Sequence, residues 1–213
     1  MLSALMDGRA LTAGELATVA GIRAPAASAH LSKMLDGGFV ALAAQGRHRY
    51  YRIASVDVAN ALEALAVVSE ARPVRTLRTS SAAKALRPAR LCYDHIAGVL
   101  GVRIHDHLAS TGAITVDARG MGLSASGAAW FARAGVDVDG ALPSRRPLIR
   151  PCLDWTERRS HLAGHLPARL ATSLLDQGWL RRRAPSERGL TITARGSAAL
   201  ADLLDIAPDE LSA

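Results

Sequence analysis

The sequence predicts a mainly α-helical fold with small β-hairpins, an α+β class, built as one N-terminal unit followed by two copies of a second unit. Three observations lead to this prediction. Two short capped helices precede a basic hairpin, an apolar helix follows them, and one motif in the second half recurs 66 residues further on. The chain has 213 residues, of which 49% are apolar and 21% charged, a balance typical of a globular protein with a sizeable core.

Two helices are expected near the N-terminus. Thr12 and Glu15 have the spacing of a capping box that opens a helix through residue 20. Gly21 ends this helix, and a tight turn leads to a second helix over residues 25–35, which begins at a proline and ends before Gly37-Gly38. The side chains expected to face inward are those of Leu16, Val19, Ala27, Leu31 and Met34.

A basic hairpin closes this unit. Residues 39–43 alternate as a strand, Gln45-Gly46 forms a turn, and residues 47–53 return as a second strand. Helices followed by a two-stranded basic wing make a winged helix–turn–helix, in which the second helix enters the major groove of double-stranded DNA. A winged helix that only binds proteins is the alternative. The residues expected to contact DNA are Arg23, Ala26, Ser28, Ala29, His30, Ser32 and Lys33 on the helix and Arg47, His48 and Arg49 on the wing.

The charge distribution supports a nucleic-acid partner for the first part of the chain. The net charge of +7 arises from 26 basic and 19 acidic residues, and nearly all the basic residues are arginines. Residues 1–54 carry +3, residues 55–70 carry −3 and residues 71–90 carry +6. Residues 71–90 are therefore expected to be a basic linker, and the double-stranded operator DNA to bind within the first 90 residues.

An apolar helix is expected over residues 55–70. Val58, Leu62 and Leu65 lie along one side of it, and it carries little charge. A short helix of this kind must pack against another surface, which favours a dimerisation helix and hence a homodimer.

The second half contains an internal repeat, which predicts winged-helix-like copies over residues 91–136 and 137–213. The segment that begins at His95 recurs from His161, and a Cys-x-Asp triplet precedes each copy. Each copy is expected to form two helices, a hairpin and a closing helix, over residues 126–134 in the first copy and 194–204 in the second.

The repeated segments also contain residue types that bind metals. Two thiolates and two imidazoles can hold zinc or another thiophilic divalent metal, and two histidines one helical turn apart can share one ion. The candidate ligands are Cys92, His95, Cys152, His161 and His165. The cysteines could instead be a redox pair, or contribute to a site for an organic ligand, or be buried structural residues, with Asp94 and Asp154 as helix caps.

Three further sets of polar and aromatic residues are expected to have structural and not functional roles. His105-Asp106-His107 is expected on a solvated helix face, since its counterparts in the second copy cannot ligate. Residues 181–183 are three arginines, expected to be a solvated charge run, with a second DNA-contacting wing as the alternative. Trp155 and Trp179 are expected to pack in the core or between the copies.

The N-terminal third resembles a known family. Glu15-Leu16-Ala17, the Pro25…Ser28-x-His30-Leu31 helix, Gly37-Gly38 and the wing Gly46-Arg47-x-Arg49-Tyr50-Tyr51 resemble the winged-helix domain of ArsR/SmtB-type bacterial repressors. The resemblance covers residues 1–69, and the duplicated half resembles an extended subgroup of these regulators. It implies a homodimeric repressor that a metal ion or another inducer releases from its operator.

Two features depart from this family. The chain begins at the segment that resembles the family's second helix, so that either the start lies too late or dimerisation relies on residues 55–69 and the C-terminal half. The helix over residues 12–20 has no Cys-x-Cys, and residues 55–69 contain no histidine. The family's common metal sites therefore cannot be assigned here.

Composition and motifs exclude several classes. No apolar run is long enough for a membrane helix, the N-terminus lacks a secretory signal pattern, and two cysteines cannot form a disulfide scaffold. We expect a cytoplasmic protein with reduced thiols. Gly-rich phosphate loops, HExxH and GxSxG are all missing, so we expect no enzyme. The alternatives are a thiol- or metal-dependent enzyme fused to a DNA-binding domain, and a nonspecific architectural DNA binder.

Overall fold

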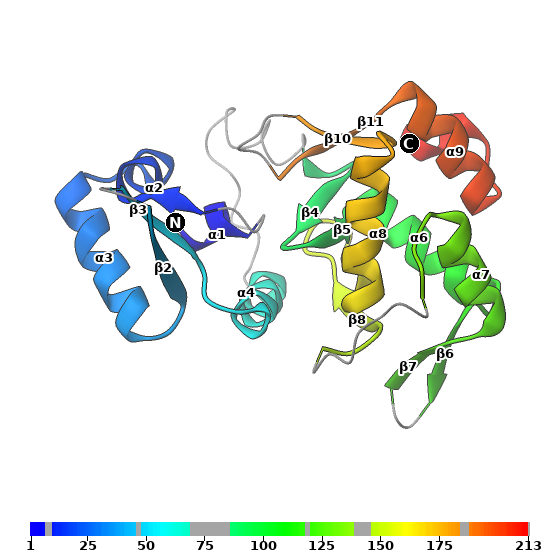
Figure 1. Ribbon diagram of the computed structural model, residues 1–213, viewed down its shortest axis with the longest axis horizontal. Coiled ribbons are helices and arrows are strands. Elements are labelled where there is room, and N and C mark those ends of the chain that lie inside the picture. The colour runs from blue at the N-terminus through cyan, green and yellow to red at the C-terminus, as the bar shows by residue number, and fades with distance from the viewer. Residues whose placement is uncertain are drawn as a thin grey trace. The chain divides into compact units, whose positions relative to one another are not determined.

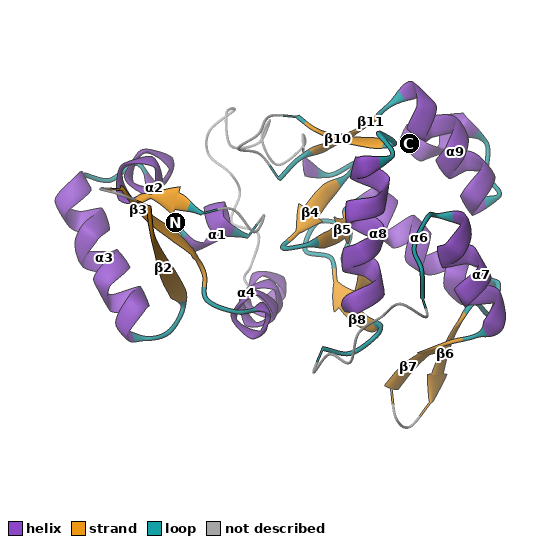
Figure 2. Cartoon of the chain, in the orientation of Figure 1, coloured by secondary structure: helices purple, strands orange, loops and turns teal. Residues whose placement is uncertain are grey.

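The computed structural model describes residues 1–6, 10–45, 48–68, 86–117, 120–138, 146–183 and 188–212. The chain forms two compact units, Met1–Leu65 and Ala66–Ala213 (Figure 1). Most of the expected basic linker, residues 71–85, lies outside the described residues. The fold is mixed, with helices and small antiparallel hairpins, as the sequence predicts (Figure 2).

The first unit is a winged helix–turn–helix. Its three-stranded antiparallel sheet has the order β1-β3-β2, and β1 pairs with β3 through Leu11 and Tyr51, a pairing that the sequence did not predict. The elements are α1 (Leu2–Leu5), β1 (Leu11–Thr12), α2 (Ala13–Ala20), α3 (Ala24–Asp36), β2 (Val40–Gln45), β3 (His48–Ile53) and α4 (Val56–Val68).

The helix pair α2–α3 forms as its caps indicate. Thr12 and Glu15 form the predicted capping box, and Gly21 ends α2 with a φ of 65°, a left-handed conformation that glycine adopts without strain. Of the side chains expected inward, Leu16, Ala27 and Leu31 are buried and Met34 is half-buried.

The prediction for Val19 is wrong, because its side chain is 64% exposed and Ala17 is buried in its place. Leu16 and Ala17 are about 100° apart around the helix, so a face centred between them points about 110° away from Val19. Helix α2 therefore buries a narrower face than the sequence predicts.

In the second unit, the two copies have the same order of elements: hairpin, helix, hairpin, helix. The first copy contains β4 (Arg90–Cys92), β5 (His95–Ala97), α6 (Val99–Ser110), β6 (Ile114–Asp117), β7 (Gly120–Leu123) and α7 (Ala125–Arg133). The second contains β8 (Arg150–Leu153), β9 (Ser160–Ala163), α8 (His165–Asp176), β10 (Leu180–Arg182), β11 (Leu190–Ile192) and α9 (Ala194–Leu204), followed by the 3-10 helix η1 (Pro208–Ser212).

The expectation that each copy begins with two helices is wrong, because a hairpin takes the place of the first helix. The reason lies in Gly98 and Gly164, whose φ angles of 79° and 118° separate a strand from the helix that follows. The N–H groups that begin the two helices are satisfied alike. Val99 donates to the Arg87 carbonyl and His165 to the Pro147 carbonyl, both at 2.9 Å.

The two copies interlock around one hydrophobic core. Helix α6 of the first copy packs on β9 of the second, and α8 of the second packs on β5 of the first (Figure 1). Side chains of both copies, among them Leu108, Phe131, Leu174 and Leu200, belong to the same buried cluster. Within the described residues, no helix combines the length and apolar character needed to cross a membrane.

Candidate metal centre and nucleic-acid interface

The exposed face of α3 carries the residues expected to read DNA. Arg23, Ala26, Ser28, Ala29, His30, Ser32 and Lys33 are all exposed, while Ala27 and Leu31 fix the opposite face in the core. Pro25 lies in the first turn, and α3 has no acidic residue there. Small side chains let such a helix approach a base edge or a phosphate closely, and hydrogen-bond donors without a nearby carboxylate can bind it.

The wing is described in part. Arg49 is exposed on β3, opposite Ala44 of β2. The backbone of His48 belongs to β3, but its side chain and the whole of Arg47 lie outside the described residues. Arg52 is also exposed on β3 and adds a second described positive charge to this strand.

The second candidate site begins with the register of two hairpins. Cys92 lies directly opposite His95 in the β4–β5 hairpin, and Cys152 lies directly opposite His161 in the β8–β9 hairpin. Residues opposite each other in an antiparallel pair project from the same face of the hairpin. Each hairpin therefore presents one thiol and one imidazole side by side.

The packing of the two copies brings these pairs together. The ligand atoms of Cys92, His95, Cys152 and His161 all lie within 4.8 Å of one another, and all four residues are buried. The Nε2 atoms of His95 and His161 are 3.1 Å apart, and the two rings are stacked with centroids 5.1 Å apart. Two hairpins, one from each copy, thus build one centre.

A carboxylate lies near the Nδ1 atom of each imidazole, on the side of the ring opposite the centre. Asp94 Oδ1 is 3.2 Å from His95 Nδ1, and Asp154 Oδ2 is 3.7 Å from His161 Nδ1. Each carboxylate binds an arginine of the other copy, since Arg146 Nη2 donates to Asp94 at 2.9 Å and Arg90 Nη2 donates to Asp154 at 2.8 Å. Two ion pairs thus cross between the copies beside the centre.

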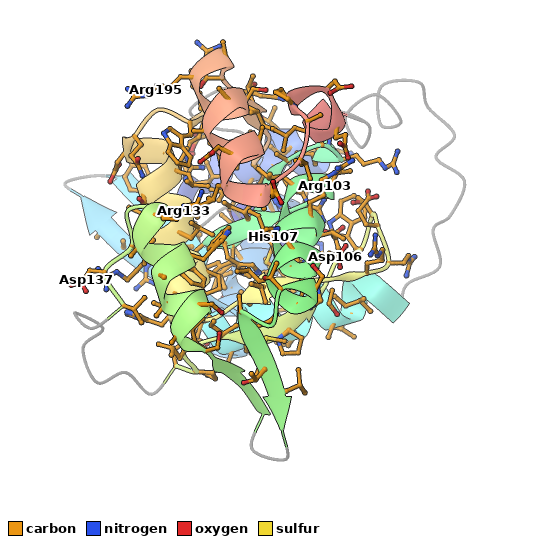
Figure 3. The ribbon with its side chains drawn as sticks, turned by 90° about the vertical axis from the view of Figure 1, so that its right-hand side faces the viewer. Arg103, Asp106, His107, Arg133, Asp137 and Arg195 are labelled. Atoms are coloured by element: carbon orange, nitrogen blue, oxygen red, sulfur yellow. The ribbon has the colours of Figure 1, made fainter. Side chains whose placement is uncertain are left out.

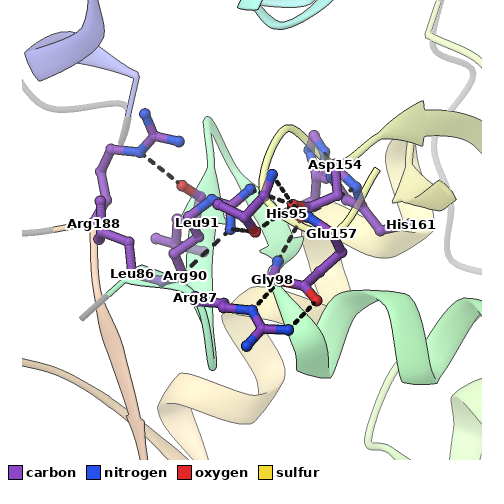
Figure 4. Close-up of polar contacts among 11 residues, drawn as sticks. Leu86, Arg87, Arg90, Leu91, His95, Gly98, Asp154, Glu157, His161 and Arg188 are labelled. Carbon is purple, nitrogen blue, oxygen red and sulfur yellow. Dashed lines mark hydrogen bonds and ion pairs between the residues drawn. The ribbon is translucent and has the colours of Figure 1, made fainter. Parts of the chain in front are cut away.

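Asp154 is the best-connected residue of this region (Figure 4). It accepts hydrogen bonds from the Gly98 N–H at 2.7 Å and from the backbone and hydroxyl groups of Thr156 at 2.8 and 2.7 Å. Its partner Arg90 is fully buried and lies 4.9 Å from the ring centroid of Trp155, a cation–π arrangement. The loop 154–159 and the start of α6 are therefore held by one carboxylate.

Electrostatics favour ionised carboxylates and a thiolate here. Burial opposes ionisation of Asp94, but Arg146 and His95 outweigh it and lower its pKa to about 2. Burial is likewise outweighed at Asp154, where Arg90 and the Gly98 N–H hold the pKa below its usual range. The Cys92 hydrogen bond lowers the pKa of Cys152 against the effect of burial, and the two histidines add to this. Thiolate is the form in which cysteine binds metals.

Some sequence predictions fail at this centre. His165 does not join it, because His161 ends up in strand β9 and His165 opens α8 beyond Gly164, so that the two are not one helical turn apart. His165 instead lines an open pocket of about 580 Å³ with Asp94 and Arg169. The two aspartates do not cap the helices of their own copies. Arg90 does not belong to the basic linker expected over residues 71–90, because it begins strand β4 and is buried.

The three groups that were given structural interpretations agree with their predicted environments only in part. The residues of His105-Asp106-His107 are half-buried, because Asp106 binds Arg159 at 2.6 Å and His107 lies 6.3 Å from the Trp130 ring (Figure 3). Trp179 packs against the core, and Trp155 of the second copy lies over the guanidinium of Arg90 of the first, so both tryptophans lie in the core or between the copies as expected. Arg181 and Arg183 are exposed at β10.

The sequence reasoning missed the arginines that hold the carboxylates. Arg90 and Arg150 both stand two residues before a cysteine, so the repeated motif is Arg-x-Cys-x-Asp rather than Cys-x-Asp. Extending the repeat by two residues would have identified Arg90. Its cross-copy partner Asp154, and the role of Arg146, follow only from the interlocked packing.

Comparison with known proteins identifies one strong relationship. The HTH-type transcriptional regulator YdfF of Bacillus subtilis (strain 168) is 37% identical over 206 residues, which cover 97% of this chain and 91% of that protein. No protein-family model matches the chain. No solved structure matches it either.

Proposed function

The chain belongs to the HTH-type transcriptional regulators, and we propose that it is a dimeric repressor of the ArsR/SmtB type that binds a short inverted-repeat operator. DNA binding is placed in residues 1–54 and control in the C-terminal unit. The single observation that carries the proposal is the relationship over 97% of the chain, because it includes both the DNA-reading unit and the duplicated unit.

Operator recognition is assigned to α3 and the wing. Ser28 and His30 are exposed donors in the middle of α3, and Ala26 and Ala29 leave room for close approach to base edges. Lys33, Arg47 and Arg49 are assigned to phosphates, which position the domain but carry no sequence information. Arg23, Ser32 and His48 complete the proposed contacts.

The homodimer is assigned to α4. Leu65 is 61% exposed within the described chain, although it is a large apolar side chain. Ala59 is buried and lies about 120° around the same helix from Leu65, so one face of α4 is already covered. A second copy that covers Leu65 would place two α3 helices on two half-sites of an inverted repeat.

Release from DNA is assigned to an inducer sensed in the C-terminal unit, either a metal ion or a thiol-reactive or organic ligand. Zinc or another thiophilic divalent metal is the cofactor that the Cys/His cluster fits best. We assign no catalytic activity to the chain and place it in the cytoplasm with reduced thiols. A thiol-dependent turnover that Cys92→Ser abolishes would favour the enzyme alternative instead.

The test of DNA recognition uses a double-stranded operator that the wild-type protein selects from random sequence. The double variant Arg47→Ala/Arg49→Ala should bind this operator more weakly, and the slope of log K against log salt should flatten by about 1 for each lost phosphate contact. The matched control is Arg133→Ala/Arg195→Ala, which removes two described arginines of the other unit (Figure 3).

The outcomes separate the alternatives. Equal affinity and slope for the wing variant and the wild type would remove the wing from the interface. Failure to select any common sequence, with undiminished binding to random DNA, would indicate an architectural DNA binder instead of a repressor.

A further inference from the structure

We propose that Cys92, His95, Cys152 and His161 hold one zinc-class divalent ion in a closed tetrahedral site that joins the two copies. The site itself stands on geometry that is independent of DNA binding. Its role as the inducer site rests on the proposed function above.

The donor atoms have the separations that a tetrahedral ion requires. Bonds of about 2.0–2.1 Å to nitrogen and about 2.3 Å to sulfur place the donors of a tetrahedron about 3.3 to 3.8 Å apart. The His95 and His161 Nε2 atoms are 3.1 Å apart, and all four donors lie within 4.8 Å of one another. Binding then requires only small shifts of the four donor atoms.

The imidazoles are oriented as metal ligands. Asp94 lies at hydrogen-bond distance from His95 Nδ1, so that the proton of a neutral ring sits on Nδ1 and the lone pair on Nε2. His161 Nδ1 faces the Asp154 carboxylate at 3.7 Å, and a proton there is favoured over a lone pair pointed at an anion. The two Nε2 atoms face each other at 3.1 Å, a hydrogen-bond distance at which one ring carries the shared proton when no metal is bound. A divalent ion would replace that proton and bind both nitrogens.

The environment of His161 is a further reason to expect a metal ion at this centre. Its side chain is fully buried, yet its Nδ1 has no hydrogen-bond partner among the described residues. A buried polar atom without a partner costs free energy, and such cases call for an explanation. A metal at Nε2 would make the Nδ1–H a stronger hydrogen-bond donor and so strengthen its interaction with Asp154.

Charge and donor type select the ion. Two thiolates neutralise one divalent ion, so that the loaded centre carries no net charge in a buried environment where an unpaired charge is costly. Sulfur and imidazole nitrogen favour zinc and other thiophilic metals over magnesium and calcium, which take oxygen ligands.

The coordination number bears on function. Four protein ligands fill a tetrahedral ion, whereas catalytic zinc keeps one position for water or substrate. The geometry therefore places this centre among the closed sites, which have no open position for a substrate. Since two ligands come from each copy, metal loss would release a link between β4–β5 and β8–β9 at the place where the copies interlock.

The experiment uses the full chain, reduced, stripped of metal with a chelator and titrated with Co²⁺ as a spectroscopic probe and with Zn²⁺. We expect one ion per chain, sulfur-to-cobalt charge-transfer absorption and the intense visible bands of tetrahedral Co²⁺. Cys92→Ser and Cys152→Ser should each weaken the charge-transfer band and lower the affinity more than 100-fold. Asp94→Asn, which keeps all four ligands, should lower it about 10- to 100-fold.

His165→Ala is the matched control, because His165 lies near the centre but outside the cluster, and it should bind Co²⁺ like the wild type. If a cysteine variant fails to fold, a thermal-unfolding scan of the wild type still tests for the metal site. We expect Zn²⁺ to raise the Tm and Mg²⁺ to leave it unchanged. Octahedral Co²⁺ spectra, no bound ion, or loss of the ion in His165→Ala would each overturn the site. A site that binds zinc without altering operator affinity would leave the metal centre intact and remove only its proposed role as the inducer site.

Discussion

The guanidinium of Arg90 lies 2.8 Å from the carboxylate of Asp154, and both side chains are fully buried. Arg90 comes from the first copy and Asp154 from the second, and Asp154 also accepts the N–H of Gly98 at the start of α6. The mirror relationship exists on the other side, where Arg146 of the second copy binds Asp94 of the first. These crossed pairs hold the two carboxylates behind the histidines of the Cys/His cluster.

Removing Arg90 should destabilise the C-terminal unit strongly. Arg90→Ala leaves the Asp154 charge buried without its partner, and the breaking of a buried pair costs about 3–5 kcal/mol. The three tryptophans of the chain, Trp130, Trp155 and Trp179, all lie in this unit, so the tryptophan fluorescence during urea unfolding reports on it alone.

Arg133→Ala provides the control for this loss. It breaks a described ion pair with Asp202 that is exposed to solvent, and such pairs contribute about 0–1 kcal/mol. Equal losses of unfolding free energy in the two variants would contradict the structural role given to Arg90.

The closing helices should not tolerate a methyl group at their first glycine. A Cβ on Gly196 would lie 2.0 Å from the Trp179 carbonyl oxygen, and one on Gly127 would lie 2.1 Å from that of Ala113. Gly196→Ala should therefore cost about 1–3 kcal/mol or more, through displaced backbone. The same fluorescence measurement checks it, and Ala198→Ser, at an exposed position of α9, should change the free energy by at most about 0.5 kcal/mol.

A carboxylate on the exposed face of α3 should weaken operator binding. Ala29→Asp places a negative charge where we assign contact with DNA, and the affinity should fall about tenfold or more without a change in the circular dichroism spectrum. The control, Ala198→Asp, makes the same charge change in the other unit. If both variants bind like the wild type in a fluorescence-anisotropy titration, α3 is not the reading helix.

A charge on α4 should weaken the proposed dimer. Leu65→Asp should raise the dimer dissociation constant about tenfold or more, because a carboxylate in an apolar contact loses its hydration. Val116→Asp, at an apolar residue of β6 that is 78% exposed, should have no such effect. Sedimentation equilibrium measures both, and a monomeric wild type would refute the assignment of α4.

Sequence reasoning predicted the first unit well because its signals are local. The Thr12–Glu15 box, Gly21 and the alternation in β2 and β3 each specify their own structure within a few residues. The β1–β3 pairing was missed because Leu11–Thr12 is too short to show a pattern, and its partner lies about forty residues away.

The copies were harder to predict. A short apolar run such as His95–Ala97 fits a strand or a buried helix equally well, and the turn at Tyr93 has a φ of 60° that no glycine signals. The duplicated Cys and His residues did indicate the cluster, because the repeat places equivalent residues at equivalent sites. The crossed arginine pairs could not be predicted, since they depend on how the copies interlock.

We propose that metal occupancy in the C-terminal unit controls operator binding by the N-terminal unit. The most direct measurement is the operator affinity of the full-length, reduced protein as Zn²⁺ is added at constant ionic strength, beside Cys152→Ser. We predict that zinc weakens binding by the wild type about 5- to 150-fold and leaves the variant unchanged. A wild-type affinity that zinc does not change, or an equal shift in Cys152→Ser, would contradict it.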